Sequence, residues 1–142
     1  MQMSMKNNIQ TLFLELANYL NKVLVKIYEN QKNEISHHIK EVQLYINKNY
    51  ALNITLDKIS AIAGFNATYF STLFKKETGI GFLEYITNIR INAAKHLLGD
   101  LNKSILEICY DVGYSDLKHF TKQFKKLTKL TPSEYRKFHY RG

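Results

Sequence analysis

The fold of this chain is decided by a segment that occurs twice, first as Leu56-Asp-Lys-Ile-Ser-Ala-Ile-Ala-Gly64-Phe65 and again as Ile105-Leu-Glu-Ile-Cys-Tyr-Asp-Val-Gly113-Tyr114. Each copy leads into a second repeated segment, Phe70-Ser-Thr-Leu-Phe74-Lys75-Lys76-Glu-Thr78 and then Phe120-Thr-Lys-Gln-Phe124-Lys125-Lys126-Leu-Thr128. The offset between the copies is 49 residues before the turn and 50 residues after it. A unit this short that occurs twice indicates a duplicated supersecondary motif.

Each copy has the layout of a helix-turn-helix. A short helix with apolar periodicity is followed by a glycine, a few polar residues and a basic helix that carries two phenylalanines four residues apart. The second helix of such a motif is the one presented to DNA. The sequence therefore predicts two helix-turn-helix units, over about residues 55–79 and 104–129.

The rest of the chain is also predicted to be helical, so the expected fold class is all-α. The sequence has one Pro, no Trp and no alternating strand pattern bounded by turns. A helix over about residues 82–98 is expected to link the two units, and Pro132 is expected at the first position of a last helix. Three helix starts carry side chains suited to N-capping, namely Thr55, either Asn66 or Thr68, and Ser104.

Residues 1–34 are predicted to form a separate linker or dimerisation helix. Its apolar residues have the 4-3-4-3-4 spacing of a heptad seam, and they are Ile9, Phe13, Leu16, Leu20, Val23 and Ile27. The polar patch Asn30-Gln-Lys-Asn33 interrupts this pattern and is interpreted as a hinge. A second helix is expected to resume at Ile35 and to end near Asn49, as the start of a domain over residues 35–142.

The charge of the chain is positive and unevenly distributed. The net charge is +8, of which residues 1–50 contribute +2 (six Lys, four Glu) and residues 51–142 contribute +6 (fourteen basic, eight acidic residues). Residues 117–141 contain one acid, Glu134, and the basic residues Lys118, Lys122, Lys125, Lys126, Lys129, Arg136, Lys137 and Arg141. A basic end beside a helix-turn-helix favours a phosphate-binding surface over a merely solvated face.

Other kinds of site find little support in the sequence. Cys109 is the only cysteine, and it lies on an apolar helix face, where a small core residue is expected. The histidines are scattered, and there is no phosphate-binding glycine loop and no nucleophile beside a base. We therefore expect no enzyme activity, catalytic residue, metal or cofactor. No signal peptide or membrane span is predicted, and the expected location is the cytoplasm.

Residues from about Ile35 to Tyr140 resemble the DNA-binding domain of the AraC/XylS family of bacterial transcription regulators. The similarity rests on residues in both units and the linking helix: Arg90, Ala93-Ala94, Leu97-Leu98, Ser104-Ile105, Glu107-Ile108, Val112-Gly113-Tyr114, Phe120, Phe124-Lys125-Lys126 and Thr131-Pro132-Ser133-Glu134-Tyr135-Arg136. Two departures are Cys109, where the family usually has alanine, and Tyr114, where phenylalanine is usual. The resemblance implies seven helices in two subdomains and sequence-specific binding of double-stranded DNA.

Spacing and resemblance together suggest which side chains reach the DNA. The first recognition helix would present Thr68, Ser71 and Thr72, with Asn66 and Lys75 beside them, and the second would present Lys118, Thr121 and Lys122, with Lys125 nearer the phosphates. A linking helix of this length spans about 25 Å at about 1.5 Å per residue. With its turns, it can hold both recognition helices about 34 Å apart, facing adjacent major grooves.

Several alternatives remain open at this point. The chain could be a helical protein-interaction module, or a fragment of a larger sensor-regulator that no longer binds DNA independently. A suicidal alkyl-transfer repair protein can carry such a domain but needs several reactive cysteines. The heptad helix could pair with a second copy, fold back on its own domain or pack against another domain. RNA polymerase is a candidate partner, activation of transcription a candidate role, and the operator and inducer are open.

Overall fold

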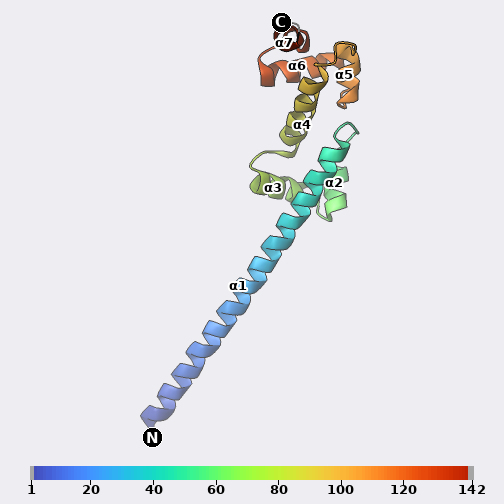
Figure 1. Cartoon of the computed structure of the whole chain (residues 1–142). Helices are drawn as coiled ribbons and strands as arrows, with labels where there is room; N and C mark the ends of the chain where they lie inside the picture. Colours follow the sequence, from blue (N-terminus) through green and yellow to red (C-terminus); the bar gives the residue numbers. More distant parts are fainter. Residues whose placement is uncertain (1, 141–142) are drawn as a thin grey trace. The chain divides into compact units, whose positions relative to one another are not determined.

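The computed structural model describes residues 2–140, which form seven α-helices and no strand (Figure 1). The helices are α1 (Gln2–Asn49), α2 (Leu56–Ala63), α3 (Ala67–Thr78), α4 (Phe82–Leu97), α5 (Ile105–Asp111), α6 (Leu117–Thr128) and α7 (Pro132–Tyr140). The predicted all-α fold class is confirmed, as are the two helix-turn-helix motifs, α2–α3 and α5–α6. Arg141, one of the basic residues counted above, lies outside the described residues.

The hinge predicted at Asn30–Asn33 is wrong, because α1 passes through it without a break. These four residues include neither Pro nor Gly, and Gln and Lys are good helix formers. The chain divides into two compact units, one ending at His38 and the other beginning at Ile39. The predicted domain boundary between residues 34 and 35 is not tested by this division and stays a prediction.

The helix starts of the second unit are fixed by local side-chain caps. The Thr55 hydroxyl accepts a hydrogen bond from the Lys58 N–H at 3.2 Å, and Asn66 Oδ1 accepts one from the Tyr69 N–H at 2.8 Å. Asn66, and not Thr68, is thus the cap of α3. The α5 helix has a full capping box between Ser104 and Glu107. These bonds satisfy N–H groups that have no partner inside the helix.

The duplication extends to the ends of the recognition helices. The hydroxyls of Thr78 and Thr128 donate to the carbonyls of Phe74 and Phe124, both at 2.8 Å, four residues earlier. The same hydroxyls accept from the Ile80 N–H at 3.4 Å and the Leu130 N–H at 3.3 Å. Each hydroxyl therefore joins the last turn of its helix to the chain that follows, which directs both copies into their next helix in the same way.

The phenylalanines of both motifs form the core of the second unit. Phe70, Phe74, Phe120 and Phe124 are fully buried. Phe74 meets the ring of Tyr85 edge-on at 5.2 Å, and in the second copy Phe124 meets Tyr135 edge-on at 5.3 Å. Burying one such side chain stabilises a fold by about 1.5–3 kcal/mol. These four aromatic side chains therefore belong to the core of the unit.

Two arginines brace the loops that precede the motifs. Arg90 on α4 donates from Nε to the Tyr50 carbonyl at 2.8 Å and from its terminal guanidinium nitrogen to the Leu52 carbonyl at 3.0 Å. Arg136 on α7 repeats this pattern with the Leu98 carbonyl at 3.0 Å and the Asp100 carbonyl at 3.2 Å. Each arginine therefore holds the loop that precedes one helix-turn-helix motif: Arg90 holds the loop between α1 and α2, and Arg136 holds the loop between α4 and α5.

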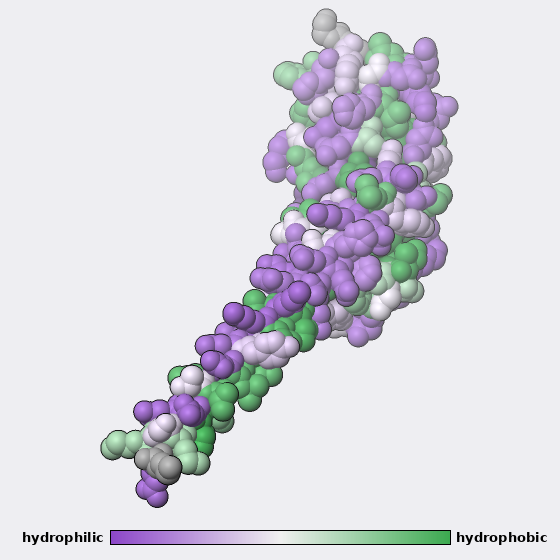
Figure 2. All heavy atoms as spheres, turned by 60° about the horizontal axis from the view of Figure 1, so that its bottom comes forward, coloured by the Kyte–Doolittle hydropathy of each residue, from purple (hydrophilic) through white to green (hydrophobic). Residues whose placement is uncertain are grey.

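The first unit is a helical segment that leaves large apolar side chains uncovered. The six residues of the predicted seam are all exposed, from 36% for Val23 to 74% for Phe13. Green apolar atoms run along part of this helix in Figure 2, next to purple polar ones. Among the described residues, no helix combines the length and apolarity that crossing a bilayer requires.

Candidate nucleic-acid interface

The first recognition helix, α3, presents short polar side chains to solvent. Thr68, Thr72 and Lys75 are exposed, whereas Ser71 is half-buried. The Thr72 hydroxyl donates to the Thr68 carbonyl at 3.2 Å, so its proton is already in use within the helix. Asn66 is exposed, but its side-chain oxygen is engaged in the helix cap. The side-chain NH2 group of Asn66, the Thr68 hydroxyl and the Thr72 hydroxyl oxygen can still form hydrogen bonds with a base.

The second recognition helix, α6, presents lysines at the matching places. Lys118, Lys122 and Lys125 are exposed, and Thr121 is half-buried. Thr121 lies 50 residues after Ser71, and both are half-buried; the residues three before and one after are exposed in both helices, Thr68 and Thr72 on α3 and Lys118 and Lys122 on α6. The structure thus places all nine predicted site residues on, or at the start of, the two second helices of the motifs.

Two further side chains on these helices were not predicted from the sequence. Tyr69 on α3 and His119 on α6 are exposed, and they lie 50 residues apart. The Tyr69 ring meets Phe65 at 5.4 Å, and the His119 ring meets Tyr114 at 5.6 Å. The sequence repeat could have predicted both residues, because they occupy equivalent positions in the two copies. In each copy, an aromatic residue of the loop before the recognition helix contacts a ring in the first turn of that helix.

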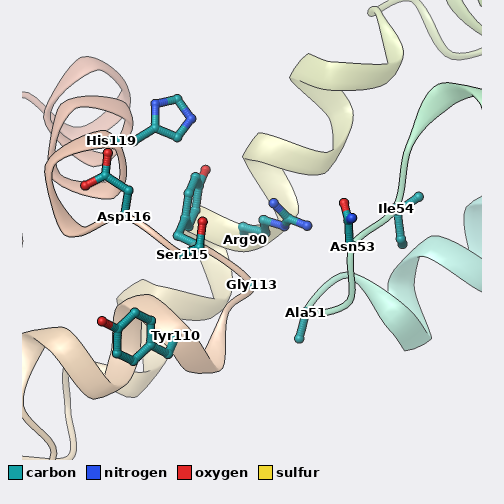
Figure 3. Close-up of a pocket in the computed structure, with 10 residues that line it drawn as sticks. Ala51, Asn53, Ile54, Arg90, Tyr110, Gly113, Ser115, Asp116 and His119 are labelled. Carbon is teal, nitrogen blue, oxygen red and sulfur yellow. The ribbon is translucent and has the colours of Figure 1, made fainter.

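The end of α6 nearest the turn borders an open cleft of about 650 Å³. Figure 3 shows Arg90 on α4 between the segment that carries Asn53 and the segment that carries Ser115, with His119 on α6 and Asp116 at the N-cap of that helix. The Arg90 guanidinium lies 5.4 Å from the centre of the Tyr114 ring. Burial lowers the pKa of Arg90 and raises the pKa of Tyr114, and their interaction opposes both shifts. Arginine stays protonated in proteins, and the raised pKa of Tyr114 keeps its hydroxyl protonated, so a cation faces a neutral ring.

Neither catalytic nor metal chemistry is expected from the sequence, in which Cys109 is the single cysteine. Cys109 is fully buried, and its Sγ lies 3.8 Å from the Tyr114 carbonyl oxygen. Burial raises the pKa of this thiol, which disfavours the thiolate needed for nucleophilic attack. Within residues 2–140, no group of three or more His, Cys, Asp or Glu side chains could hold a metal ion.

The architecture defines a class of protein. Two helix-turn-helix motifs share one compact unit, α4 lies between them in the chain and packs against α3, α5 and α6, and the second helix of each motif exposes a polar or basic face. These are the features of a nucleic-acid-binding domain with two reading helices.

Comparison with known proteins identifies the family. The family model described as a helix-turn-helix domain matches residues 59–137, and the chain belongs to the AraC/XylS family of transcription regulators, whose domains of this type bind DNA. The Tn10 TetD protein of Escherichia coli is 38% identical over 99 residues, which cover 70% of this chain and 72% of that protein. The match to the regulator YtdP of Bacillus subtilis is 33% identical and covers 77% of this chain but 13% of that protein.

One further relative carries a second activity in its name. The bifunctional transcriptional activator/DNA repair enzyme AdaA of Bacillus subtilis is 35% identical over 107 residues, covering 75% of this chain and 51% of that protein. This chain therefore spans only a part of both Bacillus relatives.

Solved structures have the same fold. The C-terminal domain of AraT, a response regulator of Geobacillus stearothermophilus, matches with a TM-score of 0.69 and 30% identity, over 72% of this chain and 85% of that one. The DNA-binding domain of AdpA, solved in complex with a target DNA, matches with a TM-score of 0.68 and 20% identity, over 71% of this chain and 91% of that one.

Proposed function

We propose that this chain binds double-stranded DNA with α3 and α6 in adjacent major grooves and regulates transcription from an asymmetric site. The observation that carries the proposal is the matched exposure of the two helices, which bury phenylalanines on one face and expose equivalent polar positions on the other. One chain then contacts two half-sites about one turn of DNA apart, about 34 Å, without a symmetric partner.

The two half-sites are read by different chemistry. Lys118 and Lys122 on α6 can donate to the O6 and N7 acceptors of guanine, while Thr68 and Thr72 on α3 offer short hydroxyl groups. Lys75 and Lys125 lie one turn further along their helices and are assigned to phosphates, which receive most of the hydrogen bonds in such interfaces. We expect a guanine-containing half-site under α6 and weaker direct readout under α3.

The rival proposal is a helical interaction module that has lost DNA binding. The basic second motif favours DNA, because its second helix exposes four lysines that suit a phosphate-binding surface, namely Lys118, Lys122, Lys125 and Lys126. Measuring the salt dependence of duplex binding separates the two proposals, since DNA binding through several phosphate contacts weakens steeply as salt rises.

The test begins with selection of a preferred duplex from random DNA. Affinities of the intact chain, Lys122→Ala and Lys125→Ala are then measured on that duplex and on random duplex at several salt concentrations. Lys122→Ala should cost about 1–3 kcal/mol on the selected duplex and relax the preference at one base. Lys125→Ala, the matched control one turn away, should weaken both duplexes equally and reduce the salt slope by about one.

Two results would count against this assignment. Equal losses for Lys122→Ala on selected and random duplex would make Lys122 a phosphate contact. Duplex affinity that does not change with salt would overturn DNA binding itself and favour the interaction module.

We further propose that the N-terminal helix pairs with its counterpart in a second chain. The seam from Ile9 to Ile27 covers about three heptads, which is about the minimum length for a pairing helix, and its side chains are exposed in the single chain. Pairing would remove this apolar surface from water, where each such side chain stabilises by about 1.5–3 kcal/mol when fully buried.

Other aspects of the function follow from family membership and are proposed on that basis. RNA polymerase is the proposed protein partner, activation the proposed role and the cytoplasm the proposed location. We propose no enzyme activity for the chain, in contrast to the bifunctional relative AdaA. The buried state of Cys109 supports this proposal, because an alkyl-accepting thiol has to be accessible.

A further inference from the structure

The loop between α1 and α2 lies at the junction of the two helix-turn-helix motifs. Its residues Tyr50 and Leu52 receive the hydrogen bonds of Arg90, which belongs to the linking helix α4. The same loop borders the turn of the second motif, because Ala51, Gly113 and Tyr114 line one cleft (Figure 3). A segment of the first subdomain is thus held against the second.

Gly113 makes the closest approach at this junction. A Cβ atom added there would stand 2.9 Å from the Ala51 carbonyl oxygen and 3.0 Å from both the Ala51 Cα and the Tyr50 carbonyl oxygen. These are backbone atoms, which cannot move aside as the end of a flexible side chain can. Any side chain at position 113 would therefore push the turn of the second motif away from the loop of the first.

Arg90 connects both sides of this contact. Its guanidinium donates to the two loop carbonyls and lies over the ring of Tyr114, which directly follows Gly113. A cation above an aromatic ring adds attraction, and the half-buried position strengthens it. Tyr114 is itself part of the buried core of the second motif. The contact therefore extends from the first subdomain into the core of the second.

The repeat supplies an internal comparison. Gly64 holds the place of Gly113 in the first motif and also has positive φ, 78° against 101°, but a Cβ there would have no atom within 4 Å. Arg136 repeats the bonds of Arg90, here with the Leu98 and Asp100 carbonyls between α4 and α5. Both copies share the positive φ of the turn glycine and the arginine that bonds two loop carbonyls. The close backbone contact occurs at Gly113 and has no counterpart at Gly64.

We propose that Arg90, Gly113 and Tyr114 form a latch that fixes α3 and α6 relative to each other and thereby sets the spacing allowed between the two half-sites. These three are positioning residues, since they act through the recognition helices. The inference rests on the proposed function of reading two half-sites.

The physical consequence concerns DNA geometry. Inserting one base pair between the half-sites moves them apart by about 3.4 Å and rotates them by about 35°, given 10–10.5 base pairs per turn. A rigid pair of helices cannot follow this change, so it loses the second half-site. A loosely joined pair can follow it, but gains less from the second half-site because its effective concentration there is lower.

The experiment uses the intact chain and a panel of duplexes whose half-site spacing is shortened or lengthened by one or two base pairs. Wild type should show one preferred spacing. Arg90→Ala and Gly113→Ala should weaken binding at that spacing by about tenfold and flatten the preference, as expected when a linked second contact is loosened. The matched controls Arg136→Ala and Gly64→Ala should lower affinity by the same factor at every spacing and keep the preference.

A second measurement tests the latch without DNA. Spin labels at Lys76→Cys on α3 and Lys126→Cys on α6, in a Cys109→Ala background, report the distance between two exposed positions. A narrow distance distribution that broadens with Arg90→Ala supports the latch, and equally narrow distributions in both proteins overturn it. A folded Arg90→Ala protein with unchanged spacing preference also overturns it. Failure of wild type to bind any duplex would instead contradict the proposed function.

Discussion

Lys129 ends α6 in the left-handed backbone region, with φ of 67°, at the position where Gly79 ends α3 with φ of 85°. In both copies the N–H of this residue donates to the carbonyl of Lys75 or Lys125, four residues earlier. The turn therefore requires the same conformation twice, although only the first copy has the residue that adopts it without strain.

We expect Lys129→Gly to stabilise the protein. Relief of left-handed strain is worth about 1–2 kcal/mol, and the greater freedom of glycine in the unfolded chain offsets about 0.5–1 kcal/mol, leaving a net gain of about 0.5–1 kcal/mol. Urea unfolding of wild type and variant measures the difference. Gly79→Lys is the reciprocal control and should destabilise by a similar amount. A less stable Lys129→Gly protein would show that other contacts of the lysine outweigh its backbone strain.

The paired arginines show why some residue-level features could not be predicted. Arg136 follows Tyr135 directly, whereas Arg90 comes five residues after the equivalent Tyr85, so the repeat does not align them. The difference of four residues is about one helical turn, which leaves both side chains on the same face of their helices. Arg90 and Arg136 therefore make equivalent hydrogen bonds, although they do not occupy equivalent positions in the sequence repeat.

At the scale of the helix, the capping box of α5 links stability to pH. The Ser104 N–H donates to the Glu107 carboxylate at 2.7 Å, and the Glu107 N–H donates back to the Ser104 hydroxyl at 3.1 Å. Hydrogen bonds from the Ser104 backbone and side chain lower the pKa of Glu107, against a small opposing effect of burial. The charged form of Glu107 is therefore favoured in the folded state.

This predicts a loss of stability in acid that depends on Glu107. Because its folded pKa lies below its unfolded pKa, the stabilisation is complete above the unfolded value and disappears as pH falls through the folded value. Glu107→Gln should be less stable than wild type near neutral pH, and the gap should close in acid. Denaturant unfolding from about pH 7 down to about pH 3 measures this, across the range where glutamate titrates. A gap that stays constant with pH would contradict the prediction.

Ser104→Ala provides a second variant for the same measurement. It removes the hydroxyl but leaves the backbone N–H that donates to Glu107. It should therefore retain part of the pH dependence that Glu107→Gln loses.

Helix ends could be predicted well, because they depend on neighbouring residues. Thr55, Ser104 and Pro132 were expected at helix starts and lie there. The predicted break in the helix at Asn30–Asn33 was wrong, because it was inferred from apolar periodicity and not from residues that end a helix. The loss of apolar periodicity indicates that no face is buried there, but it does not prevent α1 from forming its backbone hydrogen bonds.

For the whole molecule, we predict that the chain is a dimer in solution through its N-terminal helix. Sedimentation at tens of micromolar should show two chains for wild type and one for the Leu16→Glu, Leu20→Glu double variant, because charge in the seam opposes pairing. A double substitution outside the seam, Asn18→Glu with Asn21→Glu, controls for added charge and should remain dimeric. Monomeric wild type at this concentration would exclude the dimer.

The position of the two recognition helices relative to each other was the part of the candidate site that the sequence predicted least well. Their exposed positions follow from helical periodicity and from the repeat, and they could be proposed residue by residue. The contact of Gly113 with Ala51 joins positions 62 residues apart in the chain, and no local sequence pattern predicts this contact. The half-burial of Ser71 and Thr121 likewise depends on the neighbouring helices.

The presence of two different recognition helices in one chain has a consequence for how such a regulator evolves. When each chain carries a single recognition helix and two identical chains bind one operator, one substitution in that helix alters both halves of the operator at once, so every target promoter has to change twice. Here a substitution at Lys122 leaves α3 and its Thr72 untouched. Under the proposed function, each half of the operator can drift by single mutations while the other half keeps the protein bound, and new promoters can be acquired stepwise.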